Sequence, residues 1–190
     1  MFSELATYAG TASRWGQRII NSVCVNVEGF ELFSFDVSVA FAKGMTFQEL
    51  SELTGEPVRS VQCELAPEDV TMLRTIPGFE DFDPKTEVLD MLKAIYGLKD
   101  APRAWRKKLH LVLLEFGCQP IYTDQERYVL HVASSQKGKG TLQCILSAHV
   151  DDLKGAATRA VAGRLLAHLE KNFGGVALIH ARGNRARAVP

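Results

Sequence analysis

Residues 32–41 read LFSFDVSVAF and residues 145–157 read ILSAHVDDLKGAA, and these two stretches decide the fold. Each is an apolar run with the strand-like character of a segment that packs into a core. The first run nevertheless carries Asp36, and the second carries the pair Asp151 and Asp152. A carboxylate in such surroundings is costly unless a counter-charge or a metal ion offsets it. Two strands that each carry acid at one end therefore indicate a site for divalent metal ions.

Each acidic segment also has an ordinary structural interpretation. Asp36 is consistent with a carboxylate that ends a strand and turns into solvent. The pair Asp151 and Asp152, close to a Lys-Gly, is consistent with the solvated tip of a hairpin. The metal interpretation depends on the two segments together, because metal chemistry on phosphates requires acids that converge from more than one element.

Composition narrows the class of protein. The 190 residues suit one domain, or one domain and part of another, and a hydrophobic fraction of 46% is enough for a core. The 22 basic and 22 acidic residues give no net charge, which argues against a free-standing nucleic-acid-binding protein but not against an enzyme with a local basic groove. Four scattered cysteines predict reduced thiols, and no run resembles a membrane span or a signal peptide. We expect a soluble intracellular protein.

Apolar periodicity predicts strands interspersed with helices, which is the pattern of an α+β fold. We expect helices over 13–27, from the capping-box sequence at 46–49 to Gly55, from Pro67, over 101–117 and after Thr158, and strands over 30–37, 58–65, 127–133 and 141–150. The segment 174–190 has no sustained period and is rich in Arg and Ala, so we expect one domain over 1–173 and a poorly ordered tail over 174–190.

Three motifs resemble the reverse transcriptases of copia-type retrotransposons. IYGLKDAPRAW (95–105) is similar to that family's apolar-Tyr-Gly-Leu-Lys-Gln-Ala-Pro-Arg-Ala-Trp signature. FDVSVAFAKG (35–44) is similar to its upstream Asp-Val-x-x-Ala-Phe-x-x-Gly motif, and AHVDDLKGA (148–156) to its Tyr-Val-Asp-Asp motif. The motifs occur in the family's order between about residues 15 and 173. The resemblance implies a polymerase palm, a ferredoxin- or RRM-like antiparallel sheet backed by helices, with partial fingers.

The resemblance also implies a chemistry. An RNA-directed DNA polymerase transfers a deoxynucleotide to a primer 3′-hydroxyl with the help of two Mg²⁺ or Mn²⁺ ions. One ion activates the hydroxyl, and the other neutralises the triphosphate and the leaving pyrophosphate. The catalytic, metal-binding carboxylates would be Asp36, Asp151 and Asp152, and the backbone carbonyl of Val37 would be a further ligand.

The resemblance places nucleotide-binding residues around these carboxylates. Phe41 would abut the sugar C2′ and exclude ribonucleotides, with a plain core phenylalanine as the alternative. Tyr96, Gly97 and Lys99 would lie along the incoming nucleotide and the template, because Gly97 allows the backbone to approach closely. Trp105 is expected to be a core residue that anchors the following helix.

A basic cluster opens that helix and would contact template phosphates. Its members are Arg103, Arg106, Lys107 and Lys108. A solvated charged helix face is the alternative interpretation. Two residues depart from the family pattern. His149 replaces a Tyr and would pack beneath the primer end, whereas Asp100 replaces a Gln and brings negative charge toward a negative substrate.

The implied partners are an RNA or DNA template-primer and deoxynucleoside triphosphates, with integrase and RNase H as other parts of a retroelement polyprotein. Because the family's basic fingers segment and primer-gripping stretch have no recognisable counterpart, we expect a palm-centred fragment of low activity, in a cytoplasmic virus-like particle or in the nucleus. The alternative is a decayed or repurposed remnant that binds RNA or protein without catalysis. A cyclase- or RRM-like domain would explain the acids but not IYGLKDAPRAW.

Overall fold

The computed structural model describes residues 13–132 and 140–179. The helices are α1 (Arg14–Asn26), the 3₁₀ helix η1 (Ala40–Lys43), α2 (Phe47–Thr54), α3 (Pro67–Leu73), α4 (Ala101–Phe116) and α5 (Arg159–Phe173). The strands are β1 (Glu31–Val37), β2 (Gln62–Cys63), β3 (Leu89–Asp90), β4 (Gln119–Ile121), β5 (Asp124–Val132), β6 (Thr141–His149), β7 (Asp152–Ala157) and β8 (Val176–Ile179).

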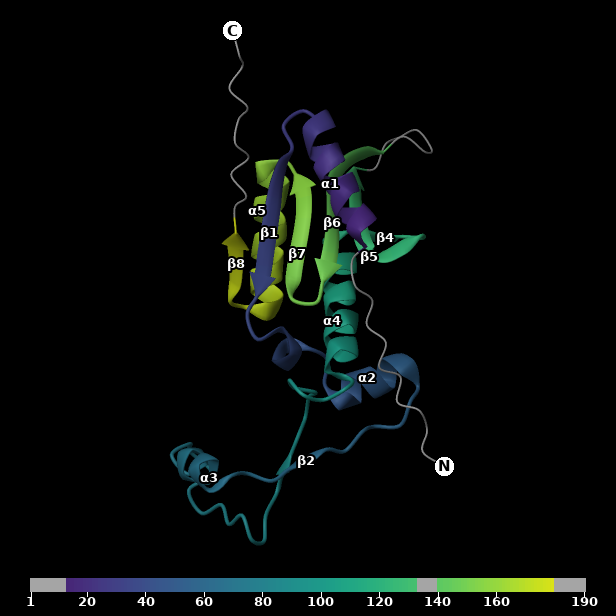
Figure 1. Ribbon diagram of the computed structural model, residues 1–190. Helices are drawn as coiled ribbons and strands as arrows, with labels where there is room; N and C mark the ends of the chain where they lie inside the picture. Colours follow the sequence, from purple (N-terminus) through teal and green to yellow (C-terminus); the bar gives the residue numbers. More distant parts are fainter. Residues whose placement is uncertain (1–12, 133–139, 180–190) are drawn as a thin grey trace.

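Six strands form one antiparallel sheet in the order β4-β5-β6-β7-β1-β8, and β2 and β3 form a separate two-stranded sheet. Helices pack on both faces of the large sheet, as Figure 1 shows. The architecture is therefore α+β with an antiparallel sheet. Its identity as a polymerase palm stays a prediction.

Helix boundaries follow local capping signals. Thr46 begins α2 with a complete capping box: its hydroxyl accepts the Glu49 N–H at 3.0 Å, and the Glu49 carboxylate accepts the Thr46 N–H at 2.8 Å. Gly55 and Gly117 end α2 and α4 in the left-handed conformation, with φ of 71° and 99°. The predicted limits of these two helices are confirmed.

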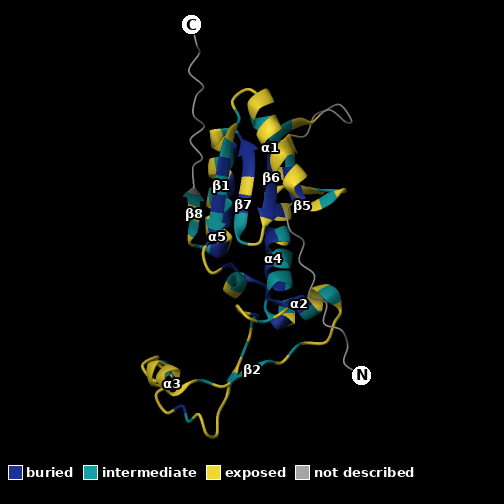
Figure 2. Ribbon diagram, in the orientation of Figure 1, coloured by how far each residue is buried: buried dark blue, intermediate teal, exposed yellow. Residues whose placement is uncertain are grey.

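The main core lies between one face of the large sheet and the helices α4 and α5. Phe35 and Leu153 project from neighbouring strands into this layer, and Trp105 and Leu113 meet them from α4. The predicted core face of α5 is buried and comprises Val161, Leu165, Leu169 and Phe173. Figure 2 shows this buried centre. All four cysteines are free, and Cys118 and Cys144 lie within the same core.

Residues 57–90 project away from the sheet (Figure 1). Within this projection only Val70 and Phe82 are buried, and Figure 2 shows a mostly exposed surface. The strand expected over 58–65 is reduced to Gln62–Cys63, so that prediction is corrected. Its alternating pattern is present, but the partner β3 offers only two residues for pairing. Within this stretch Val61 packs, partly buried, against a small cluster that includes Phe47 and Leu50.

The C-terminal segment differs from the expectation of a poorly ordered tail over 174–190. Residues Val176–Ile179 form the edge strand β8 beside β1. Gly174 and Gly175 adopt positive φ at the reversal, and the Glu170 carboxylate accepts the N–H groups of Gly175 and Val176 at 3.0 and 2.7 Å. Four residues are too few to show a period in the sequence. Residues 180–190 lie outside the described part of the chain. Within the described part, no helix is long and apolar enough to span a membrane.

Candidate functional site

The sheet face that carries α1 changes from apolar to charged along its strands. Side chains of directly paired residues in an antiparallel sheet lie on the same face, so the register defines three rows. The row packed beneath α1 is Leu32, Ala156, Ile145 and Val129. The next row is Ser34, Lys154, Ser147 and Arg127. The third row, at the end of the strands, is Asp36, Asp152 and His149.

Asp36 and Asp152 oppose each other directly across β1 and β7. Paired positions of this kind place their Cβ atoms about 5 Å apart, and like charges there are destabilising. Lys154 supplies part of the compensation, with its Nζ 3.8 Å from Asp152 Oδ2. Both carboxylates are partly exposed. Two carboxylates held close together at an accessible strand end favour the binding of a cation.

Asp151 lies in the turn between β6 and β7, and this turn is held from two sides. Its carbonyl accepts the Val37 N–H at 3.2 Å. The preceding carbonyl, of Val150, accepts the indole N–H of Trp105 at 2.6 Å, and Val150 itself has a φ of 55°. Trp105 is thus a buried core residue, as predicted, and it also fixes the backbone that carries Asp151.

The three sequence motifs meet around this turn. Val37 binds the turn directly, so the first motif contacts the third. Gly44 allows η1 to approach α4 closely. A Cβ at this position would lie only 3.0 Å from the backbone nitrogen of Trp105. The Met45 N–H then donates to the Ala104 carbonyl at 3.3 Å. Segments that are far apart in the sequence therefore form one site.

The carboxylates match the hard oxygen ligands that Mg²⁺ prefers. Among residues 13–132 and 140–179, however, no three His, Cys, Asp or Glu side chains are grouped so as to hold a metal ion. The register gathers Asp36 and Asp152, whereas Asp151 contributes from the turn. The donor chemistry fits a divalent ion, and the third carboxylate must turn toward the other two to complete the ligand set.

The predicted nucleotide-binding residues are only partly brought together. The rings of Phe41 on η1 and Tyr96 are in contact, with centroids 4.7 Å apart and planes tilted by 44°. Phe41 also packs against the core, which is the alternative that the sequence left open. Gly97 has a φ of 95° in the turn that the Leu98 N–H closes onto the Ile95 carbonyl. Lys99 is exposed beyond this turn.

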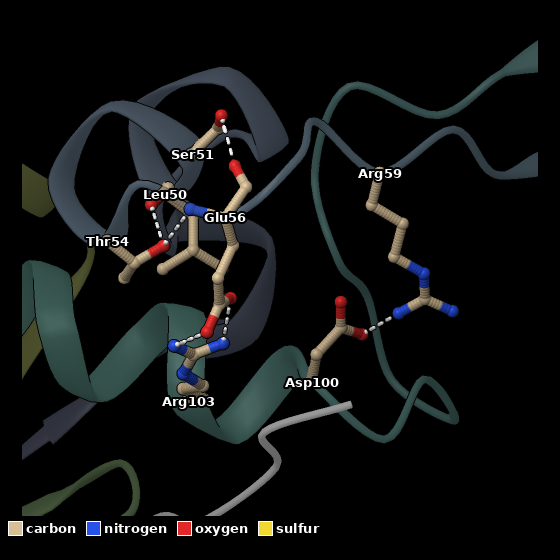
Figure 3. A network of polar contacts seen from close by, with 7 residues as sticks. All are labelled: Leu50, Ser51, Thr54, Glu56, Arg59, Asp100 and Arg103. Atoms are coloured by element: carbon tan, nitrogen blue, oxygen red, sulfur yellow. Dashed lines mark hydrogen bonds and ion pairs between the residues drawn. The ribbon is translucent and has the colours of Figure 1, made fainter. Parts of the chain in front are cut away.

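Most of the basic cluster on α4 is paired with acids. Arg103 donates to both carboxylate oxygens of Glu56 at 2.7 and 2.8 Å (Figure 3), which raises the pKa of Arg103 and lowers that of Glu56. Arg106 pairs with Glu126, and Lys108 binds Glu49 at 3.2 Å. These cations already have carboxylate partners, so phosphate contact through Arg103 or Arg106 requires their ion pairs to open. Lys107 forms no ion pair with the part of the chain that the structure describes.

Asp100 does not present the uncompensated charge that the sequence suggested. It is buried at the N-terminus of α4 and forms an ion pair with Arg59, as Figure 3 shows. The Arg59 guanidinium also lies 5.8 Å from the centre of the Phe47 ring. The prediction of a repulsive charge near the substrate is corrected, because a cation 41 positions earlier neutralises it.

The sequence did not predict two buried charged residues on β5. Glu126 pairs with Arg106, and burial raises the pKa of Glu126. Arg127 pairs with Asp124 at 2.9 Å and packs over Gly16 of α1. Consecutive charges directly before the apolar run Tyr128–Leu130 were the available signal.

Comparison of the sequence with known proteins found similarity to two retrotransposon polyproteins. No protein-family model matches the sequence, and no solved structure matches it. Over 77 residues, or 40% of this chain, the sequence is 39% identical to the retrovirus-related Pol polyproteins from transposons RE1 and RE2 of Arabidopsis thaliana. The match spans 5% of the length of each relative. This chain is therefore similar to a small part of a retrotransposon Pol polyprotein.

Proposed function

We propose that this chain is the palm-centred part of a retrotransposon reverse transcriptase, which transfers deoxynucleotides to a primer 3′-hydroxyl on an RNA template. The observation that carries the proposal is the opposition of Asp36 and Asp152 on the accessible end of β1 and β7, with Asp151 in the adjoining turn. The similarity to Pol polyproteins and the three motifs that meet at this turn support it.

The residues around the carboxylates have distinct roles in this proposal. Asp36, Asp151 and Asp152 hold two divalent ions, which supply activation of the hydroxyl and neutralisation of the triphosphate. The contacting rings of Phe41 and Tyr96 border the sugar and base of the incoming nucleotide. The ion pairs of Arg59 and Arg103 hold α2, the start of the projection and α4 together. The hydrogen bond from Trp105 keeps the Asp151 turn in place.

Primer extension on an RNA template with Mg²⁺ or Mn²⁺ tests this function. We expect weak synthesis that falls on the order of 100-fold in Asp36→Asn and in Asp152→Asn, because each removes one carboxylate from the proposed metal-binding set. The matched control is Asp90→Asn, which changes an exposed acid on the projection and should leave synthesis unchanged. Synthesis by both site variants at the level of the unmodified chain would show that these carboxylates are not catalytic.

A second candidate is a retroelement remnant that binds RNA or protein without catalysis. It is favoured by the lack of a three-carboxylate cluster within the described residues, and by the ion pairs of Arg103 and Arg106. Titration with Mn²⁺, followed by electron paramagnetic resonance, separates the two. Binding that Asp36→Asn abolishes supports the polymerase, whereas no binding in the unmodified chain favours the remnant.

A further inference from the structure

A cleft lies beside the polar rows, between the first turns of α1, the β4–β5 turn and α4. Its volume is about 620 Å³, and its walls include Trp15 and Ile19 from α1, Tyr122 from the turn and Arg106 from α4. A volume of this size suits a compact organic group. Neither the sequence motifs nor the proposed catalytic chemistry uses this cleft.

The rim of the cleft carries exposed aromatic side chains. Tyr122 is 98% exposed and Trp15 is 70% exposed. The Arg18 guanidinium lies 5.4 Å from the centre of the Trp15 ring, and Arg14 and Arg18 are the charged residues of α1. Exposed aromatic rings beside cations are the means by which proteins stack the bases of single-stranded nucleic acids.

The floor of the cleft offers fixed hydrogen-bonding groups. Glu126 and Arg127 are each 6% exposed, and they are held by ion pairs with Arg106 and Asp124. Arg127 Nε is buried without a hydrogen-bond partner among the residues that the structure describes. Gly16 leaves room for this guanidinium, because a Cβ there would lie 2.6 Å from Arg127 Nη2. Fixed donors and acceptors among the lining residues match the polar edge of a nucleobase.

The sheet register relates the cleft to the candidate catalytic face. Arg127 ends the row of Ser34, Lys154 and Ser147, which adjoins the row of Asp36 and Asp152. From β1 to β5 there are three strand spacings, or about 15 Å. A polynucleotide strand that crosses the sheet from the carboxylates can therefore reach the cleft.

We infer that this cleft binds an unpaired base of a single nucleic-acid strand. The base stacks against Trp15 and Tyr122, and its polar edge meets Arg127 and the Arg106–Glu126 pair. The inference rests on the proposed function, which brings the strand to the sheet. The ligand class is single-stranded DNA or RNA, recognised through the face and edge of one base.

The indole ring of Trp15 can serve as an intrinsic fluorescent probe of binding to the cleft. It has two tryptophans, of which Trp105 is 1% exposed, so emission from solvent-exposed indole comes from Trp15. Titration with an oligothymidylate of about twelve nucleotides should quench this emission, since bases stack on the ring. Tyr122→Ala should raise the dissociation constant on the order of 10-fold, the scale of one lost base stack. Trp15→Ala should weaken binding similarly, measured by fluorescence anisotropy of a labelled oligonucleotide.

The matched control is Val25→Ala, an 85% exposed position on the same helix and outside the cleft, which should bind as the unmodified chain does. Unchanged affinity in both Trp15→Ala and Tyr122→Ala, as expected if the cleft instead serves a protein partner, overturns the inference. Primer extension separates it from the proposed function. Synthesis that depends on Asp36, together with unaltered binding by the cleft variants, would leave the function standing and the inference wrong. Oligonucleotide binding that Trp15→Ala and Tyr122→Ala weaken, without any synthesis, would support the inference and contradict the proposed function.

Discussion

The side-chain charge of Asp36 lowers the stability of the fold relative to a neutral residue at this position. Its carboxylate opposes that of Asp152 across two strands, and such like-charge pairs cost free energy. Asp36→Asn keeps the shape and removes the repulsion. In the presence of EDTA we expect the free energy of unfolding to rise by about 0.5 kcal/mol. Urea unfolding followed by circular dichroism measures it.

Magnesium should reverse that ranking. A cation that binds the native chain through these carboxylates stabilises it by mass action, and it should stabilise the unmodified chain more than Asp36→Asn. The same urea series at millimolar Mg²⁺ provides the comparison. If Asp36→Asn is less stable than the unmodified chain in EDTA, then the opposed carboxylates do not repel each other as the register suggests.

Gly155 is required by close packing in the centre of the sheet. A Cβ there would lie 2.6 Å from the Ile145 carbonyl oxygen and would also meet the Phe33 ring. Gly155→Ala should lower the free energy of unfolding by about 1–3 kcal/mol through overpacking. Gly163→Ala is the matched control, because nothing lies within 4 Å of that position on α5. It should stabilise the chain by about 0.5–1 kcal/mol. Equal effects at the two glycines would contradict the packing argument.

Between elements, a partly buried ion pair attaches α4 to the start of the projection. Asp100→Asn removes the charge that Arg59 pairs with, and the Arg59 side chain is about one-third exposed, so part of the loss is recovered by solvent. We expect a decrease of about 1–2 kcal/mol in the free energy of unfolding, less than for a fully buried pair. The control is Glu31→Gln, whose exposed pair with Arg159 should contribute at most about 0.5 kcal/mol. A similar loss in both variants would show that burial of Asp100 does not matter.

The contact between α4 and β5 should make stability depend on pH. His110 Nδ1 lies 2.9 Å from the Tyr128 hydroxyl, and burial, with Arg106 and Lys107 nearby, lowers the pKa of His110 from 6.5. The unfolded chain therefore binds this proton first, and stability present above about pH 6.5 is lost as the pH falls toward the lowered pKa. Unfolding curves between pH 8 and pH 5 should be flatter for His110→Gln. The same slope in both proteins would exclude His110 as the cause.

Elements with local signals could be predicted from the sequence, and those that depend on distant partners could not. The capping box at Thr46 and the left-handed Gly117 are properties of a few neighbouring residues, and both are where the sequence placed them. The edge strand β8 is only four residues long and is defined by its pairing with β1. Its pattern alone did not reveal it.

The candidate site shows the same division. The sequence identified the three acids, but register decides which of them oppose each other, and a shift of one residue moves a side chain to the other face. The structure places Asp152, rather than Asp151, opposite Asp36. The partner of Asp100 lies 41 residues upstream, so no local pattern could indicate that its charge is neutralised.

At the scale of the whole molecule, the zero net charge is the sum of an acidic part and a basic part of equal and opposite charge. Residues 57–90 contain eight acidic and three basic side chains, a net charge of −5, so the remaining sequence carries +5. Five cations of that remainder lie outside the described residues: Lys137, Lys139, Arg182, Arg185 and Arg187. The acidic projection repels a polynucleotide, whereas the rest of the chain attracts one. A neutral total is therefore compatible with the proposed nucleic-acid substrate.

The same projection should be the least stable part of the described structure. Residues 57–90 bury only Val70 and Phe82, and β2 and β3 pair through two residues each, whereas β6 and β7 pair over six positions above a continuous core. Local opening requires little free energy where few apolar contacts are lost. In hydrogen exchange measured by mass spectrometry, we expect peptides that contain β2 and β3 to exchange on the order of 100-fold faster than peptides from β6 and β7. Comparable protection in both regions would mean that the projection unfolds only together with the sheet, and that the ion pair of Arg59 with Asp100 compensates for its small number of buried residues.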